Sequence, residues 1–188
     1  MKTLMVATAA VSSLLFTQIA AADDYVIDAG HSAVTFETGH IGISRLPGQF
    51  REFSGNYIYF ADNPGKNSVN LEIKVGSLDT NHGDRDKHLR SPDFFDAKQY
   101  PTITFKSTGY KGDADKGKLT GQLTMHGVTK EVTFDMVKTG EAKDPWGGYR
   151  QGFIASTQLM RSDFGITYFI PGVPDATDLK IFIEGIRQ

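Results

Sequence analysis

The stretch Val69-Asn70-Leu71-Glu72-Ile73-Lys74-Val75 alternates apolar residues with Asn, Glu and Lys. Successive side chains of a β-strand point to opposite faces, so this stretch is expected to bury one face and expose the other. Comparable alternation recurs along the chain between turns rich in glycine and proline, and long helical patterns are few. The sequence therefore predicts an all-β fold of about eight antiparallel strands. Such a sheet can close into an extended barrel, which removes its edges.

Each predicted strand has one apolar face, which we expect to line the interior of the barrel. The residues expected there are Val34, Phe36, Ile58, Phe60, Leu71, Ile73, Val75, Ile103, Phe105, Leu123, Val132, Phe134, Leu179, Ile181 and Ile183. A barrel of about eight strands is narrow, so its own side chains fill it or it holds one slender ligand. The alternation alone does not choose between these two interiors.

Two regions before residue 61 are assigned from their composition. Residues 42–48 contain two glycines and a proline, and we expect a loop there. Residues 50–60 are rich in aromatic side chains, and we expect one strand interrupted at most by a bulge. In the second half of that strand, Ile58 and Phe60 are expected to face the interior and the intervening tyrosines the other side.

Residues 118–125 and 128–137 are predicted to form a hairpin around His126-Gly127. The glycine suits the positive φ of a two-residue turn, and the histidine stands where asparagine is usual. This register places Lys130 on the apolar face. Near the end of a hairpin, a lysine side chain can extend to the rim of the barrel.

The first 22 residues have the pattern of a secretory signal peptide. A positively charged start precedes a mostly apolar run over residues 4–16, and Ala20-Ala21-Ala22 provides small residues for cleavage. The apolar run is shorter than the ~20 residues of a spanning helix, so no stable membrane anchor is expected. We expect an exported protein with one domain over residues 23–188.

Charge and cysteine content exclude several classes of protein. Without Lys2, 19 basic residues stand against 22 acidic residues, a net charge of −3. Nucleic-acid binding proteins are usually basic, so no nucleic-acid partner is expected. The chain has no cysteine, which excludes disulfides and zinc sites with thiolate ligands.

Residues 77–95 interrupt the alternation with acidic, basic and histidine residues. A short helix is expected over residues 84–90, with Asn81 as its N-cap. Acidic residues stand four positions before basic ones, which favours ion pairs along a helix. The expected pairs are Asp84 with His88 and Asp86 with Arg90. The apolar residues expected to seat this segment on the barrel are Leu89, Phe94 and Phe95.

Four interpretations of this insertion are open. It can be a solvated lid without chemistry, or a metal site, although its histidines and carboxylates follow no known ligand spacing and cations sit among them. It can hold a catalytic histidine–acid pair, but no nucleophile motif accompanies it. Its arginines and histidines can also bind the polar head group of a ligand. We therefore expect no catalytic residue, no metal and no cofactor. The head-group candidates are His40, His82, Arg85, His88 and Arg90, and for His40 a structural role remains open.

Several motifs together resemble those of the YceI-like family. They are Asp79-Thr80-Asn81-His82, Arg85-Asp86-Lys87-His88-Leu89-Arg90-Ser91, Asp93-Phe94, Tyr100-Pro101, Gly127-Val128-Thr129-Lys130, Asp144-Pro145-Trp146-Gly147-Gly148 and Asp163-Phe164-Gly165, with residues 31–40 as the first strand. The departure is His126-Gly127, where the family has Asn-Gly. The resemblance implies a lipocalin-like, extended eight-stranded barrel in an exported or periplasmic protein. It also implies a polyisoprenoid ligand, such as an isoprenoid quinone or a polyprenyl phosphate, in an apolar tunnel.

The resemblance carries no catalytic residue over to this chain. It associates the family with stress response, and a homodimer is expected from family habit alone. Three functions therefore compete. The first is binding, transport or storage of an isoprenoid lipid. The second is a hydrolase or isomerase that acts on an amphiphile with residues 82–90. The third is an interaction module with a filled barrel.

Overall fold

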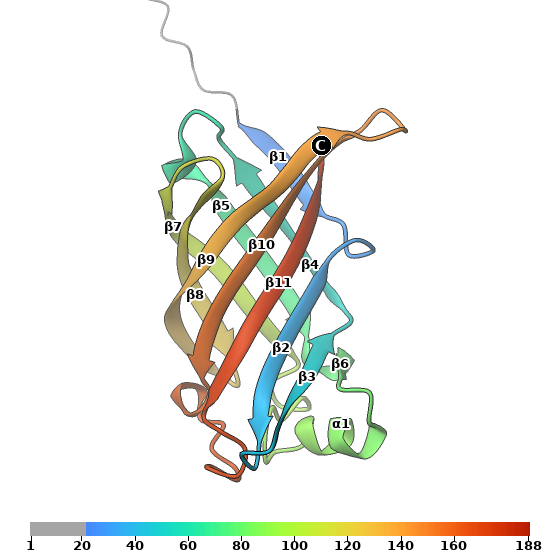
Figure 1. The fold of residues 1–188 in the computed structure, drawn as a ribbon, viewed down its shortest axis with the longest axis vertical. Coiled ribbons are helices and arrows are strands. Elements are labelled where there is room, and N and C mark those ends of the chain that lie inside the picture. Colours follow the sequence, from blue (N-terminus) through green and yellow to red (C-terminus); the bar gives the residue numbers. More distant parts are fainter. Residues whose placement is uncertain (1–21) are drawn as a thin grey trace, which may run out of the picture.

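The computed structural model describes residues 22–188, so most of the predicted signal peptide lies outside the described residues. Figure 1 shows a tall β-barrel with one short α-helix at its lower end. The strands are β1 (Asp23–Ile27), β2 (Ala33–His40), β3 (Ser44–Phe50), β4 (Phe53–Tyr59), β5 (Ser68–Lys74), β6 (Leu78–Asp79), β7 (Thr102–Gly112), β8 (Lys116–Met125), β9 (Val128–Lys143), β10 (Tyr149–Met160) and β11 (Ala176–Arg187). The helices are η1 (Pro64–Lys66), η2 (Val75–Ser77), α1 (Gly83–Leu89) and η3 (Arg161–Phe164). No helix within residues 22–188 is long and apolar enough to cross a membrane.

The barrel closes where the first strand meets the last. β1 pairs with β11 on one side and with β4 on the other, and every pairing is antiparallel. The closed circuit is β1-β4-β5-β7-β8-β9-β10-β11. The predicted eight-stranded antiparallel barrel is therefore confirmed.

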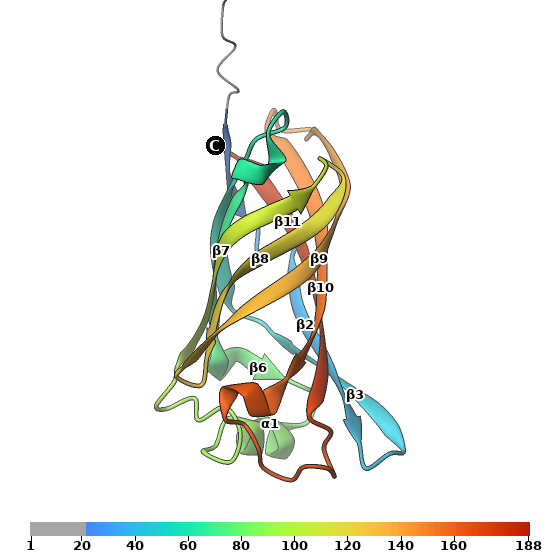
Figure 2. The ribbon, with the colours of Figure 1, turned by 90° about the vertical axis from the view of Figure 1, so that its left-hand side faces the viewer.

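Three neighbouring positions around the barrel, which we call walls, are each formed by two successive strands rather than by one continuous strand. β1 pairs with β11 near its end, and β2 continues the same wall along the earlier half of β11. β4 and β3 follow them in the next wall, and β5 and β6 in the third. β5 pairs with β7, whereas β6 is bonded to β3 alone among the described strands. The lower end is therefore open between β6 and β7, and α1 lies there (Figures 1 and 2).

The prediction of a loop at residues 42–48 is wrong, because β3 runs through most of this segment. Pro47 is tolerated there because β3 has a second partner only at Gln49 and Phe50, which leaves Pro47 on a free edge. Gly48 lies against the Phe36 ring, where any Cβ would overlap it. The strand expected at residues 50–60 is two strands, since the chain turns at Arg51 and Glu52.

This turn resets which side chains of β4 face inward. Tyr57 and Tyr59 are the buried residues of its second half, each 6% exposed. Tyr57 stacks on Tyr25 with ring centroids 4.7 Å apart. The inner face of β4 is therefore set by its tyrosines, and Phe60 lies past the end of the strand beneath the Lys66 ammonium.

The predicted hairpin between β8 and β9 is confirmed. Met125 stands opposite Val128, and both turn residues have positive φ, 52° at His126 and 75° at Gly127. The His126 ring is held by the Phe164 carbonyl oxygen, 3.0 Å from Nδ1. Lys130 extends to the exposed Asp163, 3.3 Å away, as expected for a lysine at the rim.

The helix of the insertion is confirmed, but its cap is His82 rather than Asn81. The His82 Nδ1 accepts a hydrogen bond from the Arg85 backbone N–H at 3.3 Å. Asn81 instead adopts a positive φ of 61°, which turns the chain before the helix begins. Asparagine tolerates that conformation better than most residues.

Closure of the barrel depends on close contact between β11 and the β1–β4 tyrosines. A Cβ at Gly185 would overlap the Tyr57 ring and hydroxyl, and the stack on Tyr25 keeps Tyr57 from moving aside. We expect Gly185→Ala to lower the free energy of unfolding by about 1–3 kcal/mol in urea titration. Gly109→Ala is the matched control, because a Cβ there meets open space. Equal stability of the two variants would contradict this account of closure.

Candidate functional site

A long apolar cavity occupies the barrel. It measures about 200 Å³, counted as the space that the centre of a water molecule can reach. A water molecule takes up about 30 Å³ in the liquid, so this space is far larger than a packing defect. Its walls run from Asn67, Tyr110 and Ala114 near the upper end to Phe94, Ile166 and Val173 at the lower end. The interior is therefore not filled by side chains.

Most residues expected to face the interior line this cavity. They are Val34, Phe36, Ile58, Leu71, Ile73, Ile103, Phe105, Leu123, Phe134, Leu179, Ile181 and Ile183. Val75 and Val132 are buried in the packed core. They are not among the described residues that line the cavity. Phe60 lies outside the wall because it follows the end of β4, whereas Ile58 borders the cavity from between the two tyrosines.

The wall formed by β10 was not predicted from the sequence. Phe153, Ala155 and Leu159 line the cavity from that strand, and Tyr57 and Tyr59 do so from β4. The signal was present, because Phe153, Ala155 and Leu159 follow the period of two. Thr157 interrupts this face and Ile154 stands on the opposite one, which made the apolar face of β10 less visible than that of β5.

Two polar atoms of the cavity walls lack a partner within residues 22–188. They are the hydroxyls of Thr38 and Tyr57. Burial raises the pKa of Tyr57 far above its usual value, which keeps this hydroxyl a neutral hydrogen-bond donor. An unpaired buried hydroxyl is costly, so either atom would gain from a polar group on a ligand.

The upper end of the cavity carries a cation. Lys138 extends from β9 with its side chain only 10% exposed, and its ammonium group lies 2.8 Å from the Glu141 carboxylate. The same ammonium lies 5.2 Å from the centroid of the Tyr59 ring. The charge of Lys138 is therefore compensated by its own neighbours.

The lower end is closed by residues 161–175, which we call the lid loop. Its organising side chain is Arg161, which is 7% exposed and lies at the cavity wall. The guanidinium donates to four carbonyl oxygens of the loop. They belong to Pro174 and Ile166, each at 3.0 Å, and to Tyr168 and Val173, each at 2.8 Å. Burial lowers the pKa of Arg161, yet this ring of carbonyl oxygens satisfies its donors.

The arginines proposed as head-group ligands are bound to the chain itself. Arg85 donates to the Thr80 hydroxyl at 2.7 Å and to the Thr80 carbonyl at 2.6 Å, and Arg90 donates to the Leu78 carbonyl at 2.8 Å. The prediction of ion pairs from Asp84 to His88 and from Asp86 to Arg90 is wrong. Asp86 is buried and accepts from the Thr80 backbone N–H at 2.8 Å and from its hydroxyl. The backbone leaving β6 needs these partners, because no strand follows it on that side.

The two histidines of the insertion also have structural partners. His88 lies 2.8 Å from the Asp93 carboxylate, and its ring packs edge-on against Phe94 and Tyr168. His82 caps α1, and His40 ends β2. Among the described residues that line the cavity, none of the five head-group candidates appears. Leu89, Phe94 and Phe95 do line it, so the insertion contributes apolar contacts at the lower mouth.

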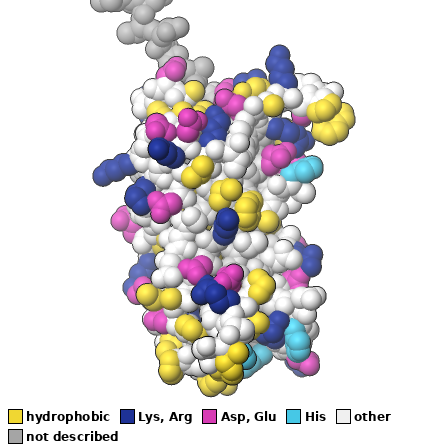
Figure 3. Space-filling view, viewed as in Figure 1, with side chains coloured by type: hydrophobic (Ala, Val, Ile, Leu, Met, Phe, Trp, Pro, Cys, Tyr) yellow, Lys and Arg dark blue, Asp and Glu magenta, His cyan; other side chains and the backbone are white. Residues whose placement is uncertain are grey.

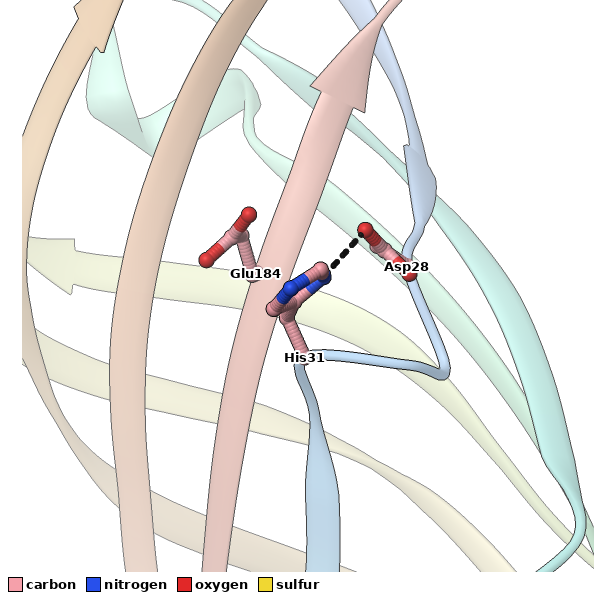
Figure 4. A group of neighbouring side chains, drawn as sticks. All are labelled: Asp28, His31 and Glu184. Carbon is pink, nitrogen blue, oxygen red and sulfur yellow. Dashed lines mark hydrogen bonds and ion pairs between the residues drawn. The ribbon is translucent and has the colours of Figure 1, made fainter. Parts of the chain in front are cut away.

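A separate cluster of titratable residues joins β1 to β11 on the outside of the barrel. Asp28, His31 and Glu184 place their ligand atoms within 4.8 Å of one another (Figure 4). The Arg150 guanidinium binds both carboxylates, at 2.7 Å from Asp28 and 2.5 Å from Glu184. This cation bridges the two carboxylates, so the cluster is an ion-pair network that ties the break between β1 and β2 to β10 and β11.

This network makes stability depend on pH. The hydrogen bond from Arg150 lowers the pKa of Asp28 to about 2. A carboxylate with a lowered pKa stabilises the folded state above its unfolded pKa, near 4, and the contribution is lost as the pH falls through 2. We expect Asp28→Asn to flatten the fall of unfolding free energy between about pH 4 and pH 2. Asp24→Asn, in the exposed part of β1, is the control, and equal slopes for both would contradict the assignment.

The hydrogen bonds of Arg161 hold the lid loop together. Arg161→Met keeps the length of the side chain but leaves four carbonyl oxygens without their donor. We expect the free energy of unfolding to fall by about 2–4 kcal/mol in urea titration. Arg45→Met is the control, because Arg45 pairs with Glu37 and Asp178 at the exposed surface, where ion pairs contribute little. If the Arg45 variant loses as much stability as the Arg161 variant, the role given to the carbonyl ring is wrong.

Comparison with known proteins places this chain. The model of the YceI-like domain matches residues 25–185. A UPF0312 protein of Photorhabdus laumondii is 44% identical over 189 residues, which cover 100% of this chain and 98% of the relative. The crystal structure of a Campylobacter jejuni YceI protein is 34% identical with a TM-score of 0.71, covering 80% of this chain and 90% of that one.

A more distant structure shares the fold. It is described as a polyisoprenoid binding domain from Saccharophagus degradans, with 14% identity and a TM-score of 0.68, over 87% of this chain and 98% of that one. The identity is too low to carry more than the fold. The family model and the relative of equal length together show that this chain belongs to the YceI-like family.

Proposed function

We propose that this protein binds one long isoprenoid lipid inside the barrel, as a carrier or store of that lipid. The observation that carries the proposal is the apolar cavity that runs through the barrel. Its length and apolar walls suit an extended hydrocarbon chain. The ligand would be an isoprenoid quinone or a polyprenyl phosphate.

The energetics of burial support this proposal. Ten methylene equivalents moved from water into the cavity contribute roughly 8 kcal/mol, before the cost of ordering the chain. That is about the free energy of micromolar binding. An isoprenoid offers more than ten such groups, so a strong polar contact is not required.

Membership of the YceI-like family and the neighbour described as a polyisoprenoid binding domain support a binding protein rather than an enzyme. The positions of residues 82–90 point the same way, because their arginines and histidines are used within the insertion and at its contacts with the barrel. The cavity also counts against a filled-barrel interaction module. A polar head group would meet the Thr38 or Tyr57 hydroxyl rather than the insertion.

The cellular setting is part of the proposal. The pattern of residues 1–22 supports export and cleavage of a signal peptide, which would place the protein in the periplasm. A carrier there would move or store lipids between membranes, and a contribution to stress response fits that role. A homodimer remains an expectation from the family.

Extraction of the purified protein with organic solvent, followed by mass spectrometry, tests the proposal. We expect a long-chain isoprenoid lipid at near one equivalent. Ala155→Phe fills the cavity at the middle of β10 and should reduce the retained lipid by about tenfold, since it removes several methylene contacts. Ile154→Phe is the control, because it adds a ring of the same size at the preceding residue, whose side chain is not part of the cavity wall.

The thermal stability of the two variants distinguishes a barrel with an open cavity from a barrel filled by its own side chains. In a cavity, the ring introduced by Ala155→Phe is accommodated and stability is nearly unchanged, whereas in a packed core it costs about 1–3 kcal/mol. No isoprenoid in the extract, and no binding of an added polyprenyl compound, would overturn the proposed function.

A further inference from the structure

The lid loop has two apolar faces. Its inner face contributes Ile166 and Val173 to the lower end of the cavity. Its outer face exposes Tyr168, Phe169 and Ile170, at 45%, 56% and 40%. One short segment therefore lies between the ligand cavity and the outside, with apolar side chains on both sides.

The hairpin between β2 and β3 adds two more exposed apolar residues to this outer face. Ile41 is 49% exposed and Ile43 is 81% exposed. The Ile41 backbone N–H donates to the Gly172 carbonyl of the lid loop at 2.8 Å, so the two loops are joined. We call Ile41, Ile43, Tyr168, Phe169 and Ile170 the mouth patch. Figure 3 shows hydrophobic side chains gathered at this lower end of the molecule.

The mouth patch continues into the cavity wall. The Tyr168 ring packs against Phe94 with centroids 5.3 Å apart, and Phe94 lines the cavity. The Val173 N–H donates to the Phe169 carbonyl at 2.9 Å, and Val173 lines the cavity as well. A single layer of side chains thus separates the patch from the lower end of the cavity.

The two segments that carry the patch have no charged side chain of their own. Residues 164–174 contain no acidic or basic residue, and neither do residues 41–44. Nearby Arg45 is paired with Glu37 and Asp178. Figure 2 shows both loops projecting at the lower end of the barrel. Projecting aliphatic and aromatic tips without charge are typical of segments that enter the interface of a lipid bilayer.

We propose that the mouth patch docks the lower end of the barrel on a lipid membrane, with the lid loop and the β2–β3 hairpin inserted into the interface. A lipid could then pass between the bilayer and the cavity without crossing water. The reason for docking rests on the proposed function, since a lipid carrier needs such a passage. Docking itself is measured separately from lipid content.

Flotation with phosphatidylcholine vesicles tests docking. We expect the purified protein to float with the vesicles, and the bound fraction to change little with added phosphatidylglycerol or with 0.5 M salt, because apolar insertion drives it. Ile43→Asp with Phe169→Asp should lower vesicle partitioning at least about tenfold. Aspartate tolerates the positive φ of 58° at Phe169, so this variant should fold normally.

Trp146 provides the matched control. It is 81% exposed, as Ile43 is, but it lies in the β9–β10 turn at the opposite end of the barrel. Trp146→Asp should therefore leave partitioning unchanged. Trp146 is also the single tryptophan of the chain, so its fluorescence should not shift when vesicles are added. With Phe169→Trp in a Trp146→Phe background, the emission should shift to the blue and be quenched by brominated lipids.

Absence of flotation would overturn the proposal, as would loss of flotation in the Trp146→Asp variant alone. If a second copy of the chain covers the patch instead, sedimentation should show a dimer that dissociates in the double variant, and the protein should not bind vesicles. That result would also overturn the proposal. Mass spectrometry of the double variant separates the two proposals. Retained isoprenoid with lost flotation supports docking and lipid binding together, whereas flotation of a protein that never holds lipid contradicts only the proposed function.

Discussion

Three walls of the barrel are each built from two strands, β1 with β2, β4 with β3, and β5 with β6, and the rest of the fold adapts to these breaks. Closure between β1 and β11 satisfies the upper half, but at β6 the chain leaves β7 and follows β3. Backbone groups exposed by this departure need other partners. Asp86, Arg85 and Arg90 provide them, by bonding to the backbone of Leu78 in β6 and of Thr80 just after it. The insertion is therefore a consequence of how the barrel opens at its lower end.

Cations lie at both ends of the cavity, and the chain itself satisfies both. Arg161 is ringed by carbonyl oxygens of the lid loop, and Lys138 is paired with Glu141. Satisfied charges attract a ligand weakly, whereas the apolar walls contribute free energy with every methylene buried. The architecture favours selection by the length and shape of an apolar chain. At the lower mouth both the insertion and the lid loop contribute to the cavity wall, but the lid loop exposes large apolar side chains to solvent.

Patterns with a strict period were read correctly from the sequence. The alternation of residues 69–75 and of β8 and β9 located most of the cavity wall and the hairpin at His126-Gly127. Errors arose where a tertiary contact overrode local pattern. Pro47 sits in a strand because its edge is free, and the phase of β4 follows the turn at Arg51. The arginines of the insertion looked available because the backbone carbonyls that they bind, those of Leu78 and Thr80, carry no mark in the sequence.

The all-β class, the number of barrel strands and the family follow from the order of residues alone, because alternation and turn residues act locally and the motifs are dense. Tertiary structure alone decided that the interior stays open and that the insertion consumes its own charges. It also brought Ile41 and Ile43 beside Tyr168 and Phe169. These outcomes depend on how side chains from distant strands fill a shared volume, and on backbone groups that every residue type carries alike.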